Sequence, residues 1–234
     1  FNPRHDFNFL VVSQFGPRKN FENTIKWFAE KFHDKEVGLI LKTSLKGSSR
    51  IDLEYTEARL GTILSHFPDR KCSVSLLHGD LSEGQMRGLY EHDKIKAMVN
   101  ISHGEGFGLP LFEAARSCLP IISIGWSGQT DFLYDKFLKV KHELGPVQQQ
   151  AVWEGVIQAD SQWAYADQGS YKMALRQMFK KYDGFVKQAK ELQKLVNANF
   201  SDEVLFEGFV GQFLEHSSSE SWTSEIEDII KEYE

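Results

Sequence analysis

The sequence predicts an α/β fold in which a parallel sheet carries helices on both faces. Short apolar runs alternate along the chain with segments of helical periodicity. The runs are of the kind found in strands buried on both faces, as the strands of parallel sheets are. The 234 residues suffice for one large domain or two small ones. Right-handed crossovers between such strands give a doubly wound sheet.

The first two predicted strands flank an amphipathic helix. The apolar run at 8–13 is the first strand, and 37–41 is the second. Between them, Asn20 is placed to cap a helix that ends near His33. Its apolar side chains recur at helical spacing: Phe21, Ile25, Phe28 and Phe32. This spacing gives the helix one face for covering the sheet.

The alternation continues through the next units. Ser82 and Gln85 form a capping box for a helix that runs to about Glu91. Pro110 suits the first turn of another helix, which ends near Ser117. The other elements expected in this half are a helix at 51–66 and strands at 73–77, 95–101 and 120–124.

The pattern weakens between residues 132 and 165, where we expect a short strand at 137–141 and otherwise loop. Helices follow at 170–182, 185–198, 202–215 and 222–233. We therefore predict a doubly wound α/β domain over residues 1–199 and a C-terminal helical segment over residues 200–234. The apolar stripe of the last helix either caps this domain or reaches another one.

Composition excludes several classes of protein. With 41% hydrophobic and 26% charged residues, the chain is neither disordered nor fibrous. A net charge of -6 argues against a nucleic-acid partner. Its 2 cysteines cannot form a disulfide framework or a four-cysteine zinc site. No apolar run approaches the roughly 20 residues of a membrane span, so we expect a cytoplasmic protein without membrane insertion.

In a doubly wound sheet, ligands bind beyond the carboxyl ends of the strands. After the first strand, Arg18 and Lys19 lie just before a helix N-terminus. Two cations beside free backbone N–H groups are typical of a phosphate site. The alternative is an ordinary solvated basic turn.

After the fourth strand comes a glycine-rich loop that contains a carboxylate. Glu105 lies within the loop, and Pro110 starts a helix that carries Glu113 about one turn later. The glycines leave backbone N–H groups open to a ligand, and they are Gly104, Gly106 and Gly108. A flexible turn before a helix is the alternative. A third loop, at 126–131, follows the fifth strand.

Several common motifs are absent from the sequence. It has no G-x-G-x-x-G, no P-loop, no D-x-D triplet and no G-x-S-x-G elbow. No histidine pair has zinc spacing, so a metal is not indicated. His103, beside the glycine loop, is either a ligand-binding or a structural residue.

Residues 102–133, SHGEGFGLPLFEAARSCLPIISIGWSGQTDFL, resemble the signature of retaining glycosyltransferases with the GT-B fold, specifically family 4. That family carries two glutamates separated by seven residues in the form EGFGLP-x-x-E. Weaker similarities occur in the family's order at 17–20, 81–90 and 162–167. The resemblance covers residues 8–183.

The resemblance implies one lobe of a two-lobed enzyme, namely the C-terminal lobe that binds a nucleotide-sugar donor. The partner implied is an N-terminal lobe that binds the acceptor. Arg18 and Lys19 would hold the diphosphate, and Glu105 would contact hydroxyls of the transferred sugar without acting as a nucleophile. No metal or other cofactor would be needed. The donor-binding set would comprise Gly104, Gly106, Phe107, Gly108, Leu109, Pro110, Glu113, Lys42 and His103.

The sequence departs from the family after the first strand. Many members have Gly-Arg where this chain has Ser13-Gln14, so one expected cation is missing. Lys42 is placed to compensate, unless it is simply a surface lysine at a strand end. From the resemblance we expect a hexosyltransferase that retains anomeric configuration. The missing cation favours the alternative, a non-catalytic module that binds a nucleotide or a nucleotide sugar. The helix at 222–233 resembles the family's last helix, which crosses to the other lobe.

Overall fold

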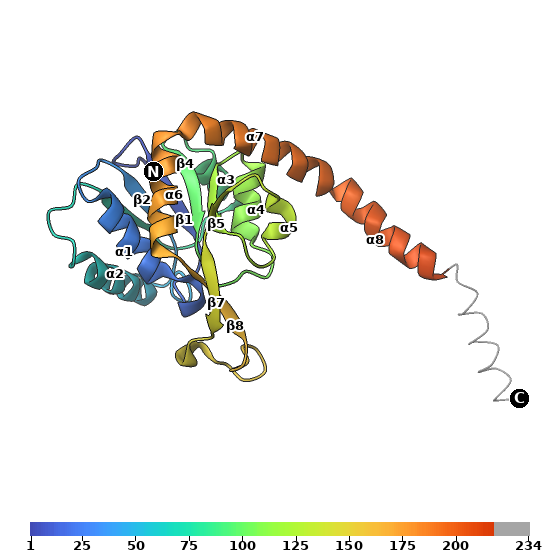
Figure 1. Cartoon of the computed structure of the whole chain (residues 1–234), viewed down its shortest axis with the longest axis horizontal. Helices are drawn as coiled ribbons and strands as arrows, with labels where there is room; N and C mark the ends of the chain where they lie inside the picture. The colour runs from blue at the N-terminus through green and yellow to red at the C-terminus, as the bar shows by residue number, and fades with distance from the viewer. Residues whose placement is uncertain (218–234) are drawn as a thin grey trace, which may run out of the picture. The chain divides into compact units, whose positions relative to one another are not determined.

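A computed structural model describes the backbone of residues 1–217 and the side chains of residues 1–212. Its centre is a six-stranded sheet in which all neighbouring strands are parallel (Figure 1). The strands are β1 (Asn8–Val12), β2 (Gly38–Lys42), β3 (Ser73–Leu77), β4 (Ile95–Asn100), β5 (Ile121–Ile124) and β6 (Leu138–Val140). Each lies within a range predicted from the sequence or within one residue of it.

The spatial order of the strands is β3-β2-β1-β4-β5-β6, so the chain reverses direction across the sheet between β1 and β4. In open α/β sheets, ligands bind outside the carboxyl ends of the strands at such a reversal. The doubly wound parallel sheet predicted from the sequence is therefore confirmed.

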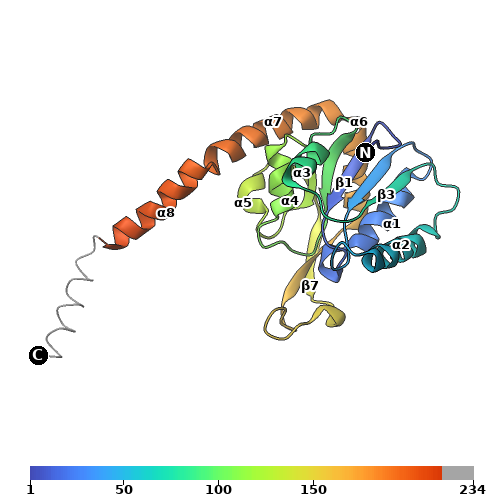
Figure 2. The same cartoon turned by 180° about the vertical axis from the view of Figure 1, so that it is seen from behind.

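Helices cover both faces of the sheet (Figures 1 and 2). The helix α1 packs against α2 and α6, whereas α4 packs against α3 and α5. The helices are α1 (Phe21–Phe32), α2 (Arg50–Leu64), α3 (Glu83–Tyr90), α4 (Leu109–Arg116), α5 (Thr130–Leu133), α6 (Gln168–Lys180), α7 (Tyr182–Asn199) and α8 (Asp202–Ser217). None of the described helices is long and apolar enough to cross a membrane.

The core under α1 is largely aromatic. The four apolar residues predicted to form one face of this helix are all buried. Phe28 and Phe32 lie with their ring centroids 6.0 and 5.7 Å from that of Phe9 on β1. Aromatic rings bury large areas in such contacts, so these rings anchor α1 to the central strand.

Residues 142–166, which we predicted to be mostly loop, contain an antiparallel hairpin. Its strands are β7 (His142–Pro146) and β8 (Gln162–Ala166), and it projects beyond one end of the sheet (Figure 1). The sequence gives little sign of β7, because His-Glu-Leu-Gly-Pro lacks alternating hydrophobicity and has Gly and Pro, which are depleted in strands. A 3₁₀ turn, η2 (Gln149–Ala151), lies in the connection.

The chain divides into two compact units, residues 1–193 and residues 194–234, with the boundary inside α7. The division expected at residues 199–200 remains a prediction. The helix expected at 222–233 lies outside the described residues.

The loop between β2 and α2 is held by one buried carboxylate. Asp52, in the first turn of α2, accepts a hydrogen bond of 2.7 Å from His78 Nε2. It also accepts hydrogen bonds from three backbone N–H groups of the loop, those of Leu45, Lys46 and Gly47. The hydrogen bond from His78 and these backbone donors lower the pKa of Asp52, against the effect of its burial.

We predict that Asp52→Asn lowers the thermal unfolding midpoint at pH 7. A lowered native pKa stabilises the fold above the unfolded-state pKa of about 3.9, and this stabilisation is lost as the pH falls below that value. The difference in midpoint between wild type and variant should therefore shrink between pH 5 and pH 3.

Calorimetric scans across that pH range measure the difference, with the exposed Glu54→Gln on the same helix as the control. A difference that stays constant down to pH 3 would contradict this account.

Candidate functional site

The loops that follow β1 and β4 meet at the carboxyl edge of the sheet. The backbone N–H of His103 donates to the carbonyl of Arg18 at 2.8 Å. Asn20 Nδ2 donates to the carbonyl of Ile101 at 3.2 Å. These contacts fix the 3₁₀ turn η1 (Pro17–Lys19) against the glycine loop. The structure therefore brings together the first two segments selected from the sequence.

Lys19 and Glu105 form a buried ion pair in this region. The Lys19 ammonium lies 2.7 and 2.6 Å from the two carboxylate oxygens of Glu105. The two side chains are only 17% and 7% exposed. Arg18 Nη1 lies 3.3 Å from the same carboxylate and also donates to the carbonyl of Gly104. Four of the predicted site residues thus share one network: Arg18, Lys19, Gly104 and Glu105.

Asn100 and Ser102 orient Glu105 from the end of β4. Asn100 Nδ2 and Ser102 Oγ donate to Glu105 Oε1 at 3.0 and 2.7 Å. Asn100 Oδ1 in turn accepts the backbone N–H of Ser102 at 2.9 Å. Sequence reasoning missed both residues, although each lies at the end of a strand beside the glycine loop.

The environment shifts the pKa values of both members of the ion pair. Burial lowers the pKa of Lys19, Arg18 adds to the effect, and Glu105 offsets it in part. Burial alone would raise the pKa of Glu105, but the hydrogen bond from Asn100 and the Lys19 ammonium outweigh it, so this pKa is lowered. Glu105 is therefore held as a carboxylate at neutral pH.

The glycine loop packs closely on the loop that follows β5. Gly128 N–H donates to the carbonyl of Glu105 at 3.1 Å. A Cβ at Gly128 would lie 1.7 Å from the carbonyl oxygen of Gly106, so only glycine fits there. Gly108 has a φ of 89° and precedes the first residue of α4. That left-handed conformation favours glycine.

The first turn of α4 directly follows the glycine loop. Leu109 and Pro110 occupy this turn, where the sequence predicted Pro110. The N-terminal N–H groups of a helix have no partners within it and favour anions. Phe107, beside this turn, packs its ring at 5.2 and 4.9 Å from the rings of Phe112 and Phe132.

Glu113 lies one turn into α4 and accepts a hydrogen bond of 2.7 Å from the Tyr90 hydroxyl. Burial, together with this carboxylate, raises the pKa of Tyr90. The contact ties α3 to α4 and orients Glu113.

His103 has a structural environment. Its ring stacks on Trp163 of β8 at 5.0 Å, with 11° between the planes. Its Nδ1 lies 2.8 Å from the carbonyl of Ala164. Burial lowers its pKa, which favours the neutral ring.

Lys42 is another of the predicted donor-binding residues. Its ammonium donates a hydrogen bond of 2.6 Å to the carbonyl of Gly79, which follows β3.

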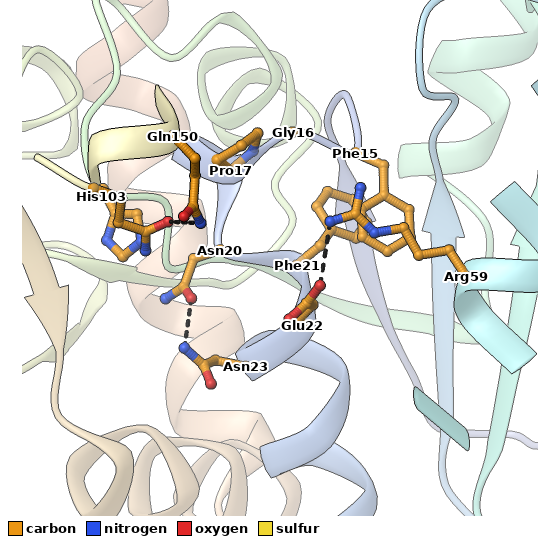
Figure 3. Close-up of a pocket in the computed structure, with 11 residues that line it drawn as sticks. Phe15, Gly16, Pro17, Asn20, Phe21, Glu22, Asn23, Arg59, His103 and Gln150 are labelled. Carbon is orange, nitrogen blue, oxygen red and sulfur yellow. Dashed lines mark hydrogen bonds and ion pairs between the residues drawn. The ribbon is translucent and has the colours of Figure 1, made fainter. Parts of the chain in front are cut away.

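A cavity of about 130 Å³ opens beside η1 (Figure 3). The stacked rings of Phe15 and Phe21 form part of its wall, and the Arg59 guanidinium lies 4.8 Å from the Phe15 centroid. Gln148 and Gln150 of the hairpin segment line it as well. Sequence reasoning missed Arg59, Gln148 and Gln150, because α2 and the hairpin, both distant in sequence from η1, supply them.

Among residues 1–217, no three His, Cys, Asp or Glu side chains are grouped to hold a metal ion. No protein-family model matches the sequence. No curated protein matches it either.

Solved structures with a similar fold include glycosyltransferases. Sucrose-phosphate synthase from Thermosynechococcus elongatus is 18% identical with a TM-score of 0.63, over 93% of this chain and 47% of that one. Anabaena HepE in complex with UDP-glucose is 16% identical with a TM-score of 0.60, over 90% and 49%. This chain thus spans about half the length of these two proteins.

The C-terminal domain of a group 1 glycosyl transferase family protein from Francisella tularensis is similar over most of both chains. It is 15% identical with a TM-score of 0.56, over 85% of this chain and 88% of that one. The likeness supports the fold: this chain has the Rossmann-like architecture of such a domain.

We predict that Lys19→Met destabilises the protein by about 3 kcal/mol, because it leaves the buried Glu105 carboxylate without its main partner. Adding Glu105→Gln should recover most of that loss, since the uncompensated charge is then gone. Urea unfolding of the two variants measures both effects.

The control is Arg50→Met, which removes a solvent-exposed ion pair with Glu54 and should have no measurable effect. A double variant no more stable than Lys19→Met alone would refute the account of a buried charge pair.

Proposed function

We propose that this chain is the donor-binding lobe of a glycosyltransferase that transfers a hexose from a nucleoside diphosphate sugar. The observation that carries the proposal is the meeting of Arg18 and Lys19 with Glu105 at the carboxyl edge of the sheet. The structural likeness to glycosyltransferases supports it, and one of those structures contains UDP-glucose.

The electrostatics of the site suit a diphosphate. Two cations face one carboxylate, which leaves a net positive charge. The amino end of α4 and the glycine loop add backbone N–H groups beside it. When the bond from the sugar's anomeric carbon to phosphate oxygen breaks, negative charge builds on the departing diphosphate. Arg18 and Lys19 would stabilise that charge.

Glu105 fits a positioning role better than a nucleophilic one. Both of its carboxylate oxygens already accept hydrogen bonds, from Lys19 and Asn100 among others. Such an oxygen is a poor nucleophile. In the proposed reaction the acceptor hydroxyl attacks the anomeric carbon on the face that the diphosphate leaves, so configuration is retained. The proton of that hydroxyl passes to the departing phosphate oxygen.

The remaining features of the proposal follow from the resemblance. Glu113 would bind the ribose hydroxyls, and no metal ion or cofactor besides the donor takes part. The acceptor would bind an N-terminal lobe, and the reaction would take place in the cytoplasm.

A second candidate is a nucleotide-binding module without catalysis. Ser13-Gln14 favours it, because a cation expected after β1 is missing. The Lys42 ammonium donates to the carbonyl of Gly79, so it is already engaged.

We predict that one nucleoside diphosphate among UDP, GDP and ADP raises the thermal midpoint of the protein without added metal. A ligand at about 100 times its Kd stabilises the fold by roughly 2.7 kcal/mol. Arg18→Ala/Lys19→Ala should abolish the shift, whereas Arg50→Ala on the exposed face of α2 should not. A shift that persists in the double variant would place the nucleotide elsewhere.

Turnover separates the two candidates. We predict that the full-length protein, in the presence of a metal chelator, forms a glycosidic product with the donor's anomeric configuration, as read from anomeric proton couplings. Glu105→Ala should lower kcat by about a hundredfold or more, because Lys19 loses its orienting partner. Nucleotide binding without any transfer by the full-length protein would favour the module.

A further inference from the structure

The tip of the β7–β8 hairpin presents an exposed aromatic side chain that the donor site does not use. Trp153 is 67% exposed and Val156 is 62% exposed. Tryptophan is enriched at binding interfaces, because its indole combines a large apolar area with one N–H donor. The tip, residues 147–161, therefore carries an aromatic side chain that is available to a partner.

Trp153 is held in place by a small hydrogen-bonded turn. The backbone N–H of Trp153 donates to the carbonyl of Ile157 at 3.0 Å. The backbone N–H of Ile157 donates to the carbonyl of Trp153 at 2.7 Å. Gly155 has a φ of 79°, which lets the chain reverse between them. At the base of the tip, Val147 N–H donates to the carbonyl of Ser161 at 3.2 Å. The backbone that carries the indole is thus fixed, which lowers the entropy lost on binding.

The neck of the hairpin, residues 142–146 and 162–166, contacts His103, which precedes the glycine loop. Trp163 stacks on His103, and Ala164 N–H donates to the His103 carbonyl at 3.0 Å. The Tyr165 hydroxyl donates to the Pro146 carbonyl at 2.6 Å and closes the neck. The tip therefore extends from the donor site as a fixed part of the same body.

The surface between the neck and the indole is rich in amides and free of basic residues. Segment 142–166 contains no Lys or Arg. Its glutamines are Gln148, Gln149, Gln150, Gln158 and Gln162. Two of them, Gln148 and Gln150, line the same cavity as His103 and Gly16, and Figure 3 shows Gln150 there. Primary amides donate and accept hydrogen bonds at once, as sugar hydroxyls do.

We infer that the hairpin tip binds a neutral carbohydrate chain, namely a distal part of the acceptor whose reacting end would bind the N-terminal lobe. The indole would stack on the C–H face of a pyranose ring, because the negative face of an aromatic ring attracts polarised C–H groups. The glutamine amides would bind hydroxyls between the tip and the cavity. The inference rests on the proposed function, since a donor site supplies the reason for an acceptor surface beside it.

Charge argues against other occupants. An anionic polymer or an acidic membrane requires cations, and the segment has only acidic charges, from Glu143, Glu154 and Asp160. A second copy of the chain would need a larger apolar area than Trp153 and Val156 offer.

The test is a titration of the full-length protein with neutral hexasaccharides of glucose, mannose, galactose and N-acetylglucosamine, and with heparin as the acidic probe. At least one neutral chain should bind. Trp153→Ala should raise its Kd about tenfold or more, as truncation of an aromatic anchor does. The matched control is Tyr55→Ala, which removes a ring that is 66% exposed on α2 and should leave the Kd unchanged.

Three results would overturn the inference: no neutral chain binds, Trp153→Ala binds like wild type, or heparin binds more tightly than every neutral chain. Dimerisation that Trp153→Ala abolishes would overturn it as well, because the tip would then be a self-association surface. The thermal midpoint of the same samples with UDP, GDP or ADP reports on the donor site. A failure of the proposed function therefore shows in that measurement, separately from a failure of the carbohydrate titration.

Discussion

The buried ion pair between Lys19 and Glu105 is the contact on which the candidate site depends. Lys19 follows the first strand of the sheet, and Glu105 follows the fourth. These strands are neighbours only because the strand order reverses between β1 and β4. Charges so well shielded from water are costly unless they are paired. The pair therefore locks the two halves of the lobe in one register and concentrates positive charge where backbone N–H groups converge.

The close packing around Gly128 serves the same constraint. The backbone of the loop after β5 presses on the carbonyl of Gly106, which no side chain at Gly128 would allow. The backbone N–H of Gly128 also donates to the backbone carbonyl of Glu105, and this hydrogen bond holds the backbone that carries the carboxylate. Three loops from three strands thus support one acidic side chain, and each loop comes from a separate part of the sequence.

Much of the lobe could be predicted from the sequence, because buried parallel strands and amphipathic helices leave strong local patterns. The Arg18–Lys19 turn and the glycine loop around Glu105 were found because ligands in such folds bind at strand ends. The hairpin was missed, since its strands pair with each other at long range and carry Gly and Pro. The bonds from Asn100 and Ser102 to Glu105 were also missed, because spacing alone does not say which way a polar side chain turns. The engagement of Glu113 by Tyr90 joins two helices and was likewise hidden in the sequence.

The hairpin divides its work between a neck and a tip. Every described hydrogen bond and ring contact from the hairpin to His103 comes from β8 in the neck, at Trp163, Ala164 and Tyr165. Residues 149 and 151–160 can therefore change in length or chemistry without disturbing those contacts. Such a layout lets one half of a binding surface diversify while the other stays fixed, much as loops vary on an immunoglobulin framework. A lobe built this way can acquire new preferences by exchanging its tip alone.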